Sequence, residues 1–280
     1  MKIYSNAKIN LGLSVLNKRK DGFHNIETFF QEISLCDEID LDTSLSDLVI
    51  RTDHKDCPSD YTNLAYKAAK ALWQHRGTQS GCSIHISKHI PVGAGLGGGS
   101  SNAASVLKAL NREWQCRLAA ERLELKAAEL GSDVPFFLRG GLAFGSGRGE
   151  QLSSIEHKPE YTGILIIPPF SISTKTIYGN LNLTNKRKIA KLKGFIDNFY
   201  RLDLWKDTLH NDLETVVFNI YPELKEIIDT LYNCGAFFAQ MSGSGSAFYG
   251  LFKSKTDMVR RCSSGFKRFR KILFEPVYRS

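Results

Sequence analysis

The residues with the clearest chemical potential are the glycines of "PVGAGLGGGSSNAA", residues 91–104. Glycine lets a backbone adopt positive φ and approach a ligand closely. The run leads into a helical pattern, where the first amide N–H groups lack intrahelical partners and attract anions. A loop that only connects two elements has little reason to bear the entropic cost of so many glycines. The stretch therefore predicts an anion-binding loop at a helix N-terminus.

Two known phosphate-binding motifs partly match this loop. Gly93, Gly95 and Gly98 satisfy the dinucleotide-binding pattern G-x-G-x-x-G. However, Pro91 interrupts the preceding strand, and the alternating polar residues of that strand are unlike a strand covered on both faces. No Gly-Lys-Ser/Thr closes the run, which excludes a Walker A loop. The remaining interpretation is a phosphate-binding loop that contains no lysine of its own.

Other candidate groups lie far apart in the chain. Lys8 and Asn10 alternate with apolar residues, so a strand would place both on one face; the alternative for Lys8 is a solvated lysine on that face. Asp133 follows a helix break and precedes a proline, so it fits either a cap of the next turn or an acid–base group. Ser100 and Ser101 fit either helix caps or hydroxyl ligands for a phosphate or its Mg²⁺.

Hydrophobic periodicity predicts the elements that carry these groups. Strand patterns cover residues 7–15, 26–42, 81–90, 164–169, 236–242 and 247–252, the first of them half-buried. Helical patterns cover residues 60–77, 100–114, 119–130, 187–201 and 212–233. Thr62 is expected as the N-cap of the helix that Gly77 ends. A short helical turn and a glycine-rich strand region are expected within 132–150, and a basic helix near the C-terminal end.

Composition limits the class of protein. The chain of 280 residues is 42% apolar, which suits a globular protein with a sizeable core. No stretch approaches the ~20 apolar residues that cross a bilayer, and the first residues lack the features of a signal peptide. The six cysteines are spread singly with no C-x-x-C pair, which favours reduced thiols over a disulfide frame or a zinc site. We therefore expect a cytoplasmic protein with no membrane contact and no structural metal.

The net charge of +8 is concentrated in residues 185–194 and 259–271. Such stretches fit an RNA-binding protein, an enzyme for polyanionic small molecules, or solvated helix faces. Basic and aromatic residues do not interleave on one pair of strands, so we expect no nucleic-acid partner.

Several motifs, in the same order along the chain, are similar to those of the GHMP kinases. They are "AKINLGLSVLNKRKDGFHNIET", the glycine loop, "ELGSDVPFFLRGG" and "MSGSGSAFYGLF", which begin at residues 7, 91, 129 and 241. The resemblance implies a two-lobed α/β (α+β) fold. Residues 1–155 would form an N-terminal nucleotide-binding domain like ribosomal protein S5 domain 2, and residues 156–280 a ferredoxin-like C-terminal domain.

The resemblance also implies an activity in the non-mevalonate route to isoprenoid precursors. With Mg²⁺, ATP would give its γ-phosphoryl group to the 2-hydroxyl of a cytidine-diphosphate-linked methylerythritol; the alternative acceptor is another small alcohol. Lys8 and Asp133 match the catalytic pair, Asp133 accepting the hydroxyl proton while Lys8 aligns the hydroxyl and offsets negative charge. The ATP phosphates would carry most of the Mg²⁺ coordination, with Ser100 or Ser101 as the candidate protein ligands.

Matching positions imply the binding residues. The ATP phosphates would lie on the main chain of Pro91, Val92, Gly93, Ala94, Gly95, Leu96, Gly97, Gly98, Gly99, Ser100 and Ser101. Asn63 matches a residue near adenine, and Lys88 one at the nucleotide's edge. On the substrate side, Asn10 would touch the methylerythritol part and His24 would read the cytosine edge, while Phe23 and Tyr178 would lie on the two faces of the base. The position of Phe23 is usually tyrosine in the family, and the turn at 243–246 is expected to close on the substrate.

Overall fold

The chain folds into two compact units, each built from separate segments of the sequence. The computed structural model describes residues 1–76, 81–183, 192–262 and 265–279. The first unit comprises Met1–Ala7, Leu35–Val92 and Gly97–Gly140, and the second comprises Lys8–Ser34, Gly93–Leu96 and Gly141–Ser280. The glycine loop and the long strands β1 (Lys2–Lys18) and β2 (His24–Asp42) therefore contribute residues to both units. A domain boundary between residues 155 and 156 stays a prediction.

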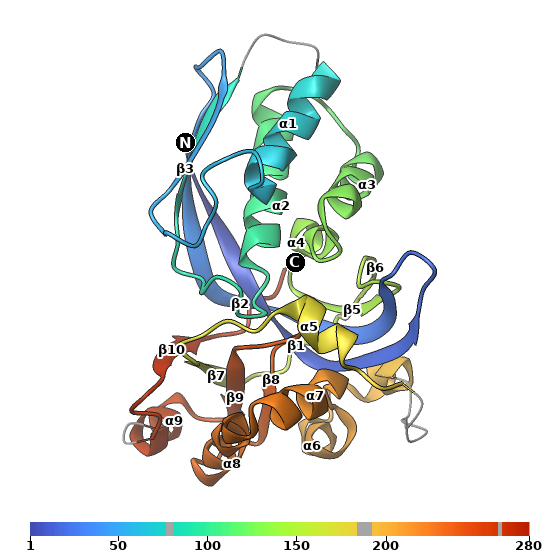
Figure 1. Cartoon of the computed structure of the whole chain (residues 1–280), viewed down its shortest axis with the longest axis vertical. Helices are drawn as coiled ribbons and strands as arrows, with labels where there is room; N and C mark the ends of the chain where they lie inside the picture. The colour runs from blue at the N-terminus through green and yellow to red at the C-terminus, as the bar shows by residue number, and fades with distance from the viewer. Residues whose placement is uncertain (77–80, 184–191, 263–264, 280) are drawn as a thin grey trace. The chain divides into compact units, whose positions relative to one another are not determined.

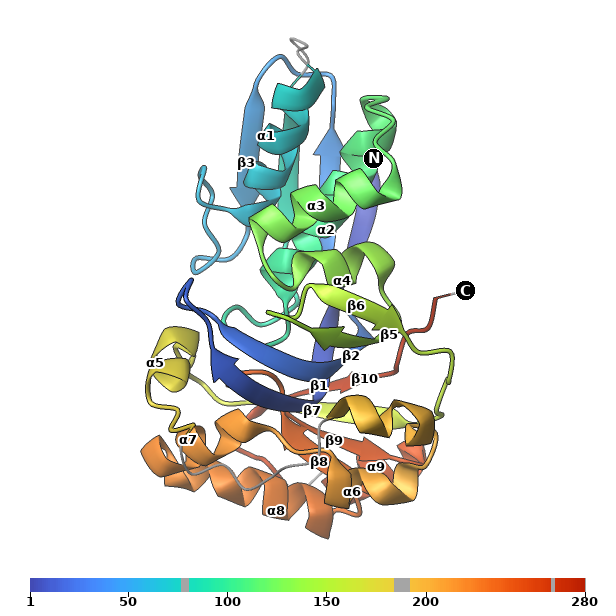
Figure 2. The ribbon, with the colours of Figure 1, turned by 90° about the vertical axis from the view of Figure 1, so that its right-hand side faces the viewer.

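In the first unit, helices cover one side of a small group of strands. The C-terminal part of β2 pairs antiparallel with β4 (Cys82–Ser87), which pairs parallel with β3 (Leu48–Thr52). The helices are α1 (Leu64–Arg76), α2 (Gly98–Glu113), α3 (Ala120–Leu130) and α4 (Val134–Arg139). Figures 1 and 2 show them on one side of these strands, with α1 and α2 side by side. The predicted succession of strand, glycine loop and helix is confirmed by β4 and α2.

The start of α1 differs from its predicted cap. Asn63 Oδ1 accepts a hydrogen bond from the Ala65 N–H at 2.9 Å, so Asn63 caps this helix. The Thr62 hydroxyl instead donates to the carboxylate of Asp60. The expected N-cap is therefore wrong by one residue, because two neighbouring residues were both suitable caps. Gly77, the predicted end of the helix, lies outside the described residues.

The second unit contains two groups of strands. The N-terminal part of β2 pairs with β1 and, antiparallel, with β5 (Leu142–Ser146), which continues antiparallel to β6 (Gln151–Ser154). A four-stranded antiparallel sheet has the order β10-β7-β9-β8. Its strands are β7 (Thr162–Ile167), β8 (Phe238–Met241), β9 (Phe248–Phe252) and β10 (Arg270–Phe274). The α-helices are α5 (Thr174–Gly179), α6 (Trp205–Thr208), α7 (Asp212–Ile220), α8 (Lys225–Asn233) and α9 (Lys255–Cys262).

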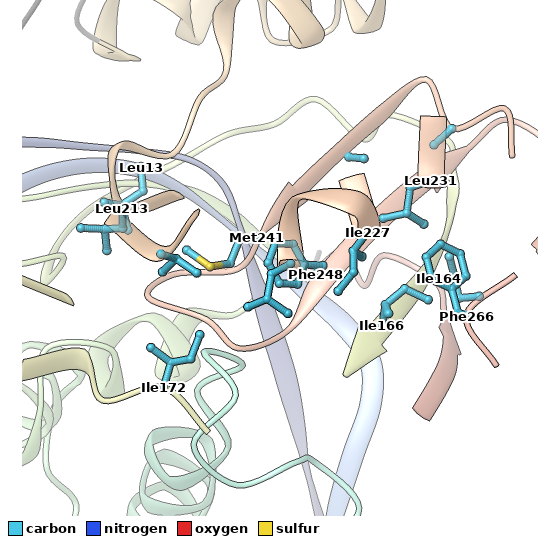
Figure 3. Close-up of a cluster of buried hydrophobic side chains, with 14 of the residues drawn as sticks. Leu13, Ile164, Ile166, Ile172, Leu213, Ile227, Leu231, Met241, Phe248 and Phe266 are labelled. Atoms are coloured by element: carbon cyan, nitrogen blue, oxygen red, sulfur yellow. The ribbon is translucent and has the colours of Figure 1, made fainter. Parts of the chain in front are cut away.

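One face of the four-stranded sheet is apolar and packs against α8 and α9, and residues of α7 belong to the same buried cluster. Met241 and Phe248 are cross-strand neighbours on this face, and Ile227 and Leu231 of α8 belong to the same cluster (Figure 3). Each fully buried side chain of this kind contributes about 1.5–3 kcal/mol to folding. The cluster therefore fixes the β8–β9 hairpin, and with it the turn that joins the two strands.

The opposite face of the β8–β9 hairpin contacts β1. Gln240 and Tyr249 are cross-strand partners there. Gln240 Oε1 accepts the Gly12 N–H at 2.8 Å, and the Tyr249 hydroxyl donates to the Asn10 carbonyl at 2.8 Å. The half-buried first strand expected from the sequence is therefore wrong: β1 is buried on both faces here, and Lys8 is only 3% exposed. A distant hairpin covers its polar face, which no local pattern shows.

Pro222 divides the helix predicted over 212–233 into α7 and α8. The preceding residue, Tyr221, has φ −130° and ψ 69°, outside the helical region, as the ring of a following proline favours. A short 3₁₀ helix, Pro222–Leu224, joins the two parts. The break comes from backbone sterics although the apolar period continues across it.

The predicted helix over 187–201 is described only from residue 192. There the chain forms 3₁₀ turns over Leu192–Asn198 and Leu202–Leu204. The predicted C-terminal basic helix is shorter than expected: α9 ends at Cys262, and the strand β10 follows. β3 and α5 have too few residues to show a period and were not predicted. None of the helices in the described part of the chain combines the length and apolar character needed to span a bilayer.

Glu214 on α7 is a buried acid behind the β8–β9 hairpin. Its Oε1 accepts the Met241 N–H at 2.7 Å. Burial raises the pKa of the Glu214 carboxyl from 4.5 to about 7, and the hydrogen bond from Met241 opposes this only in part. Between these two pH values the folded state holds a proton that the unfolded chain has released. The contribution of Glu214 to the free energy of unfolding is therefore full below pH 4.5 and lost by about pH 7.

We expect Glu214→Gln to remove this part of the pH dependence. The unfolding free energy of the parent chain should fall relative to that of the variant by up to roughly 1.4 kcal/mol per pH unit between pH 5 and 7. Urea unfolding of both proteins across this range measures the difference. Glu226→Gln, at an exposed position of α8, is the matched control and should follow the parent. Parallel curves for Glu214→Gln and the parent would contradict this account.

Candidate active site

Lys8 and Asn10 are in direct contact on β1, as their spacing predicts. The Lys8 ammonium donates to Asn10 Oδ1, and to the carbonyl oxygen of Gly95 at 3.0 Å. It also lies 5.5 Å from the centre of the Phe30 ring. The burial of Lys8 excludes a solvated lysine on an open strand face. The amine is therefore a fixed positive charge beside the middle of the glycine loop.

The Asn10 side chain is held from its other end. Its Nδ2 donates to the Thr28 hydroxyl at 2.9 Å, and that hydroxyl donates to the Gly12 carbonyl at 2.6 Å. These bonds assign the amide nitrogen to the Thr28 side and leave the amide oxygen toward Lys8. Two strands, β1 and β2, thus position the amine and the amide together.

The middle of the glycine loop lies against the turn between β8 and β9. The Gly95 carbonyl accepts a hydrogen bond from the Ser242 hydroxyl at 3.0 Å, and the Ala94 carbonyl accepts the Ala247 N–H at 3.1 Å. Gly95 has φ +78°, and a Cβ there would overlap the Ser242 carbonyl oxygen. Only glycine satisfies both conditions. The "GSGS" turn and residues Gly93–Leu96 are therefore brought together within the second unit.

Asn211 braces this turn from the α7 side. Its Oδ1 caps α7 by accepting the Leu213 N–H at 3.0 Å, while its Nδ2 donates to the carbonyls of Met241 at 3.0 Å and Gly243 at 2.8 Å. One buried side chain therefore satisfies both a helix N-terminus and the turn. The turn's position is set by α7 as well as by its own strands.

Aromatic side chains lie at the β1–β2 connection; we call Phe23, His24 and Tyr178 the aromatic group. The rings of His24 and Tyr178 lie 5.1 Å apart at 32°, so the structure brings together two residues that the family resemblance assigns to the edge and to one face of the cytosine. Phe23 is 51% exposed, and the guanidinium carbon of Arg148 lies 5.1 Å from its ring centre. The Thr174 and Ser244 hydroxyls hydrogen-bond at 2.7 Å, which ties α5, the helix of Tyr178, to the β8–β9 turn. An exposed ring with a cation beside it suits stacking by a planar base.

In the first unit, α2 begins immediately after the glycine loop. Its N-cap is Gly97, with φ 70° and no side-chain cap, so Ser100 and Ser101 lie inside the first turn and do not cap the helix. The Ser101 N–H is satisfied by the Gly97 carbonyl at 2.9 Å. The N–H groups of Gly98, Gly99 and Ser100 precede it and have no carbonyl within the helix to pair with. This end of α2 suits an anion such as a phosphate.

Asn63 and Lys88, the two residues outside the glycine loop that are predicted to bind the nucleotide, both hydrogen-bond to groups of the first unit. Asn63 caps α1, and its Nδ2 donates to the Pro58 carbonyl at 2.7 Å. The Lys88 ammonium binds the Asp37 carboxylate, and both side chains are buried. Lys88 is therefore not an exposed lysine at a strand end, and its charge is matched by an acid.

Asp133 occupies the N-cap position of α4 in the first unit. Its φ is −85°, its ψ is −13°, and its side chain makes no capping hydrogen bond. The residue is partly exposed, and Pro135 lies at the start of the helix. Capping therefore does not account for an acid at this position.

The residues present fit a Mg²⁺ ion carried by the nucleotide. Within the described ranges, no group of three or more His, Cys, Asp or Glu residues is arranged to hold a metal ion. Mg²⁺ commonly keeps several waters and binds proteins through one or two oxygen ligands plus substrate phosphates. Ser100, half-buried in the first turn of α2, offers a hydroxyl of that kind, whereas Ser101 is buried at 1% exposure.

The buried acid Asp37 and the bracing role of Asn211 were not identified from the sequence. Asp37 occupies an inward position of β2 between Leu35 and Ile39; an acid in an apolar alternation is a signal for a buried, partnered carboxylate. Asn211 and Glu214 belong to the stretch "NDLE", residues 211–214, which also fits the family resemblance. Its N-x-x-E spacing is that of a capping box and marks a helix start, but it does not indicate a brace for a distant turn.

Comparisons with known proteins identify the class of this fold. The model of the "GHMP kinases N terminal domain" matches residues 63–141, and the model of the "GHMP kinases C terminal" region matches residues 195–267. A solved homoserine kinase from Cytophaga hutchinsonii superimposes with a TM-score of 0.80, covering 99% of this chain and 94% of that one at 16% identity, so it shows the shared fold alone.

Closer relatives narrow the class. The 4-diphosphocytidyl-2-C-methyl-D-erythritol kinase of Prosthecochloris aestuarii is 43% identical over 260 residues, covering 91% of this chain and 90% of that protein. A crystal structure of 4-(cytidine 5'-diphospho)-2C-methyl-D-erythritol kinase has a TM-score of 0.84 at 32% identity, with 99% of both chains covered. The chain belongs to the GHMP kinases and, within them, to the 4-diphosphocytidyl-2-C-methyl-D-erythritol kinase family.

Proposed function

We propose that this chain transfers the γ-phosphoryl group of ATP to the 2-hydroxyl of 4-diphosphocytidyl-2-C-methyl-D-erythritol. The observation that carries the proposal is the buried Lys8–Asn10 pair held against the Gly95 carbonyl, in a member of this kinase family. Acceptors of other GHMP kinases are the alternative, and the family membership disfavours them. A cytoplasmic location and the absence of a nucleic-acid partner stay predictions from the sequence.

The predicted site residues would supply different parts of the chemistry. The first amides of α2, which have no carbonyl partner within the helix, would bind the ATP phosphates, and Mg²⁺, carried by those phosphates, would neutralise charge during transfer. Lys8 would hold the acceptor hydroxyl and offset the charge that develops on it, since its ammonium is fixed by Asn10 and Gly95. Asp133 would accept the hydroxyl proton, as its match to the catalytic aspartate of the family implies.

The identity of the acceptor is tested with a panel of alcohols. The purified protein, ATP and Mg²⁺ are assayed with the cytidylated substrate, with methylerythritol phosphate, with homoserine and with mevalonate. We expect kcat/KM for the cytidylated substrate to exceed the others by about 100-fold or more, because the others offer no base to the aromatic group. Comparable kcat/KM for homoserine or mevalonate would refute the proposed acceptor while leaving a GHMP kinase.

Phe23→Ala tests how the base is bound. Stacking of a base on an aromatic ring is worth about 1–3 kcal/mol, so we expect KM for the cytidylated substrate to rise roughly 5- to 100-fold, with KM for ATP unchanged. Tyr200→Ala is the matched control, because Tyr200 is a similarly exposed ring, at 54%, in the same unit. An unchanged KM for the cytidylated substrate in Phe23→Ala would remove Phe23 from the binding site.

A further inference from the structure

Asp37 is a buried acid of the first unit that the proposed chemistry does not use. Its side chain is fully buried, yet its neighbours on the same face of β2 are Leu35 and Ile39. A carboxylate is retained in such a place only when donors satisfy it. Four donors do so here, and they come from both sides of the glycine loop.

Three of these donors precede the loop, and two of the three are backbone amides. The His89 and Ile90 N–H groups both donate to Asp37 Oδ1 at 2.8 Å. β4 has already ended at Ser87, so these amides have left the strand ladder and need another acceptor. Asp37 supplies it, and thereby fixes the chain immediately before the first residue of the loop, Pro91.

The two side-chain donors, Lys88 before the loop and Asn102 after it, connect Asp37 to the helix that follows the loop. Asp37 Oδ2 accepts from Asn102 Nδ2 at 2.9 Å and from the Lys88 ammonium, which also donates to Asn102 Oδ1 at 3.2 Å. Asn102 lies on α2, one residue beyond Ser101, and its Nδ2 also donates to the Ser5 hydroxyl at 2.6 Å. Each of these polar groups therefore has a partner inside the protein.

Lys88 lies directly beneath the start of α2. Its Nζ is 3.1 Å from the point where a Cβ on Gly98 would lie. A larger residue at 98 or a displaced lysine would therefore move the first turn of the helix. Because Asp37 binds Lys88, the acid controls the position of this turn as well as the position of residues 89 and 90.

We propose that Asp37 is a positioning residue for nucleotide binding, which holds the two ends of the glycine loop at the spacing that aims the α2 amides at the ATP phosphates. This inference rests on the proposed function. The alternative is that Asp37 and Lys88 form a buried ion pair that matters only for folding. The two interpretations predict different ATP affinities for a variant that still folds.

The variant Asp37→Asn distinguishes the positioning role from the purely structural one. The new amide keeps an oxygen for the His89 and Ile90 N–H groups, but its NH₂ faces the Lys88 ammonium and the Asn102 NH₂, and Lys88 loses its carboxylate. Displacement of the first turn of α2 should weaken nucleotide binding about 10-fold or more, since misplacements near 1 Å carry costs of that size. KM for the alcohol acceptor should change less than about twofold, because none of the Asp37 contacts reaches Asn10, Phe23 or His24.

The double variant Asp37→Asn with Asn102→Asp moves the carboxylate from β2 to α2. It can accept from Lys88, from the amide placed at 37 and from the Ser5 hydroxyl, so the network is satisfied again with its charge unchanged. We expect ATP affinity to return to within about threefold of the parent. Calorimetric titration with a non-hydrolysable ATP analogue measures affinity, and urea unfolding measures stability of the same samples.

Weaker analogue binding in Asp37→Asn at unchanged acceptor KM, with recovery in the double variant, supports the inference. If folded Asp37→Asn binds the analogue as tightly as the parent, the inference is overturned, and Asp37 and Lys88 form an ion pair that matters only for folding. Recovery of stability without recovery of affinity in the double variant also overturns it. A parent protein that does not bind the analogue refutes the proposed function itself, which is a different result from any change confined to the variants.

Discussion

Asp133→Asn is expected to lower kcat by about 10²–10⁴, the usual contribution of a general base, while the protein still folds and binds ATP. The amide has nearly the shape of the carboxylate but takes no proton from the acceptor hydroxyl. Folding should be spared, because the Asp133 side chain makes no capping hydrogen bond at the start of α4. Single-turnover measurements with saturating ATP and acceptor isolate the chemical step from binding and product release.

Glu129→Gln is the matched control for Asp133→Asn. Glu129 lies four residues earlier, is exposed on α3, and belongs to the same unit. Its neutralisation should leave kcat within about twofold of the parent, as for most surface substitutions. Turnover by Asp133→Asn comparable to that of Glu129→Gln would show that another group accepts the proton, or that no base is needed.

Gly95→Ala is the substitution expected to harm the fold of the loop most. A Cβ at residue 95 would overlap the Ser242 carbonyl oxygen and lie 3.0 Å from the Gly245 carbonyl oxygen, and both are backbone atoms that cannot rotate away. The φ of +78° adds strain of about 1–2 kcal/mol for a non-glycine residue. With the overlap included, we expect a loss of roughly 2–4 kcal/mol of unfolding free energy.

Gly99→Ala provides the comparison within the same loop. The nearest atom to a Cβ at residue 99 is Leu64 Cδ1, at an ordinary 3.8 Å, and the residue lies in the first turn of α2. Alanine there should be neutral or stabilise by up to about 1 kcal/mol through its helix propensity. Urea unfolding midpoints of the two variants give the contrast. Equal midpoints would mean that residues 93–96 do not lie against the β8–β9 turn as described.

Local patterns in the sequence predicted the elements of the site correctly where one short period decided them. The alternation around Lys8 and Asn10 placed both on one face, and the structure has them in contact. The glycine run between an alternating and a helical segment predicted the β4–loop–α2 succession. The fold class followed from motifs in order, which the family relationship confirms. The assignments of individual site residues stay predictions.

Features that depend on distant partners could not be predicted. The β8–β9 hairpin buries the polar face of β1, although more than 220 residues separate Asn10 from Ser242 and the two are joined by a 3.3 Å hydrogen bond. Lys88 reads as an exposed lysine because its acid, Asp37, lies 51 residues earlier. Local steric effects also override the sequence patterns: Gly97 takes the N-cap position of α2 in place of the serines, and Pro222 interrupts a continuous apolar period.

The most direct test of the proposed reaction is the position of the transferred group. The protein is incubated with the cytidylated methylerythritol, Mg²⁺ and ATP labelled with ¹⁸O at the three terminal oxygens of its γ-phosphate, and the product is examined by ³¹P NMR and mass spectrometry. We predict one new phosphomonoester on the C2 oxygen that carries all three labelled oxygens. Label found only in inorganic phosphate, or a phosphoryl group on another hydroxyl, would contradict the proposed function.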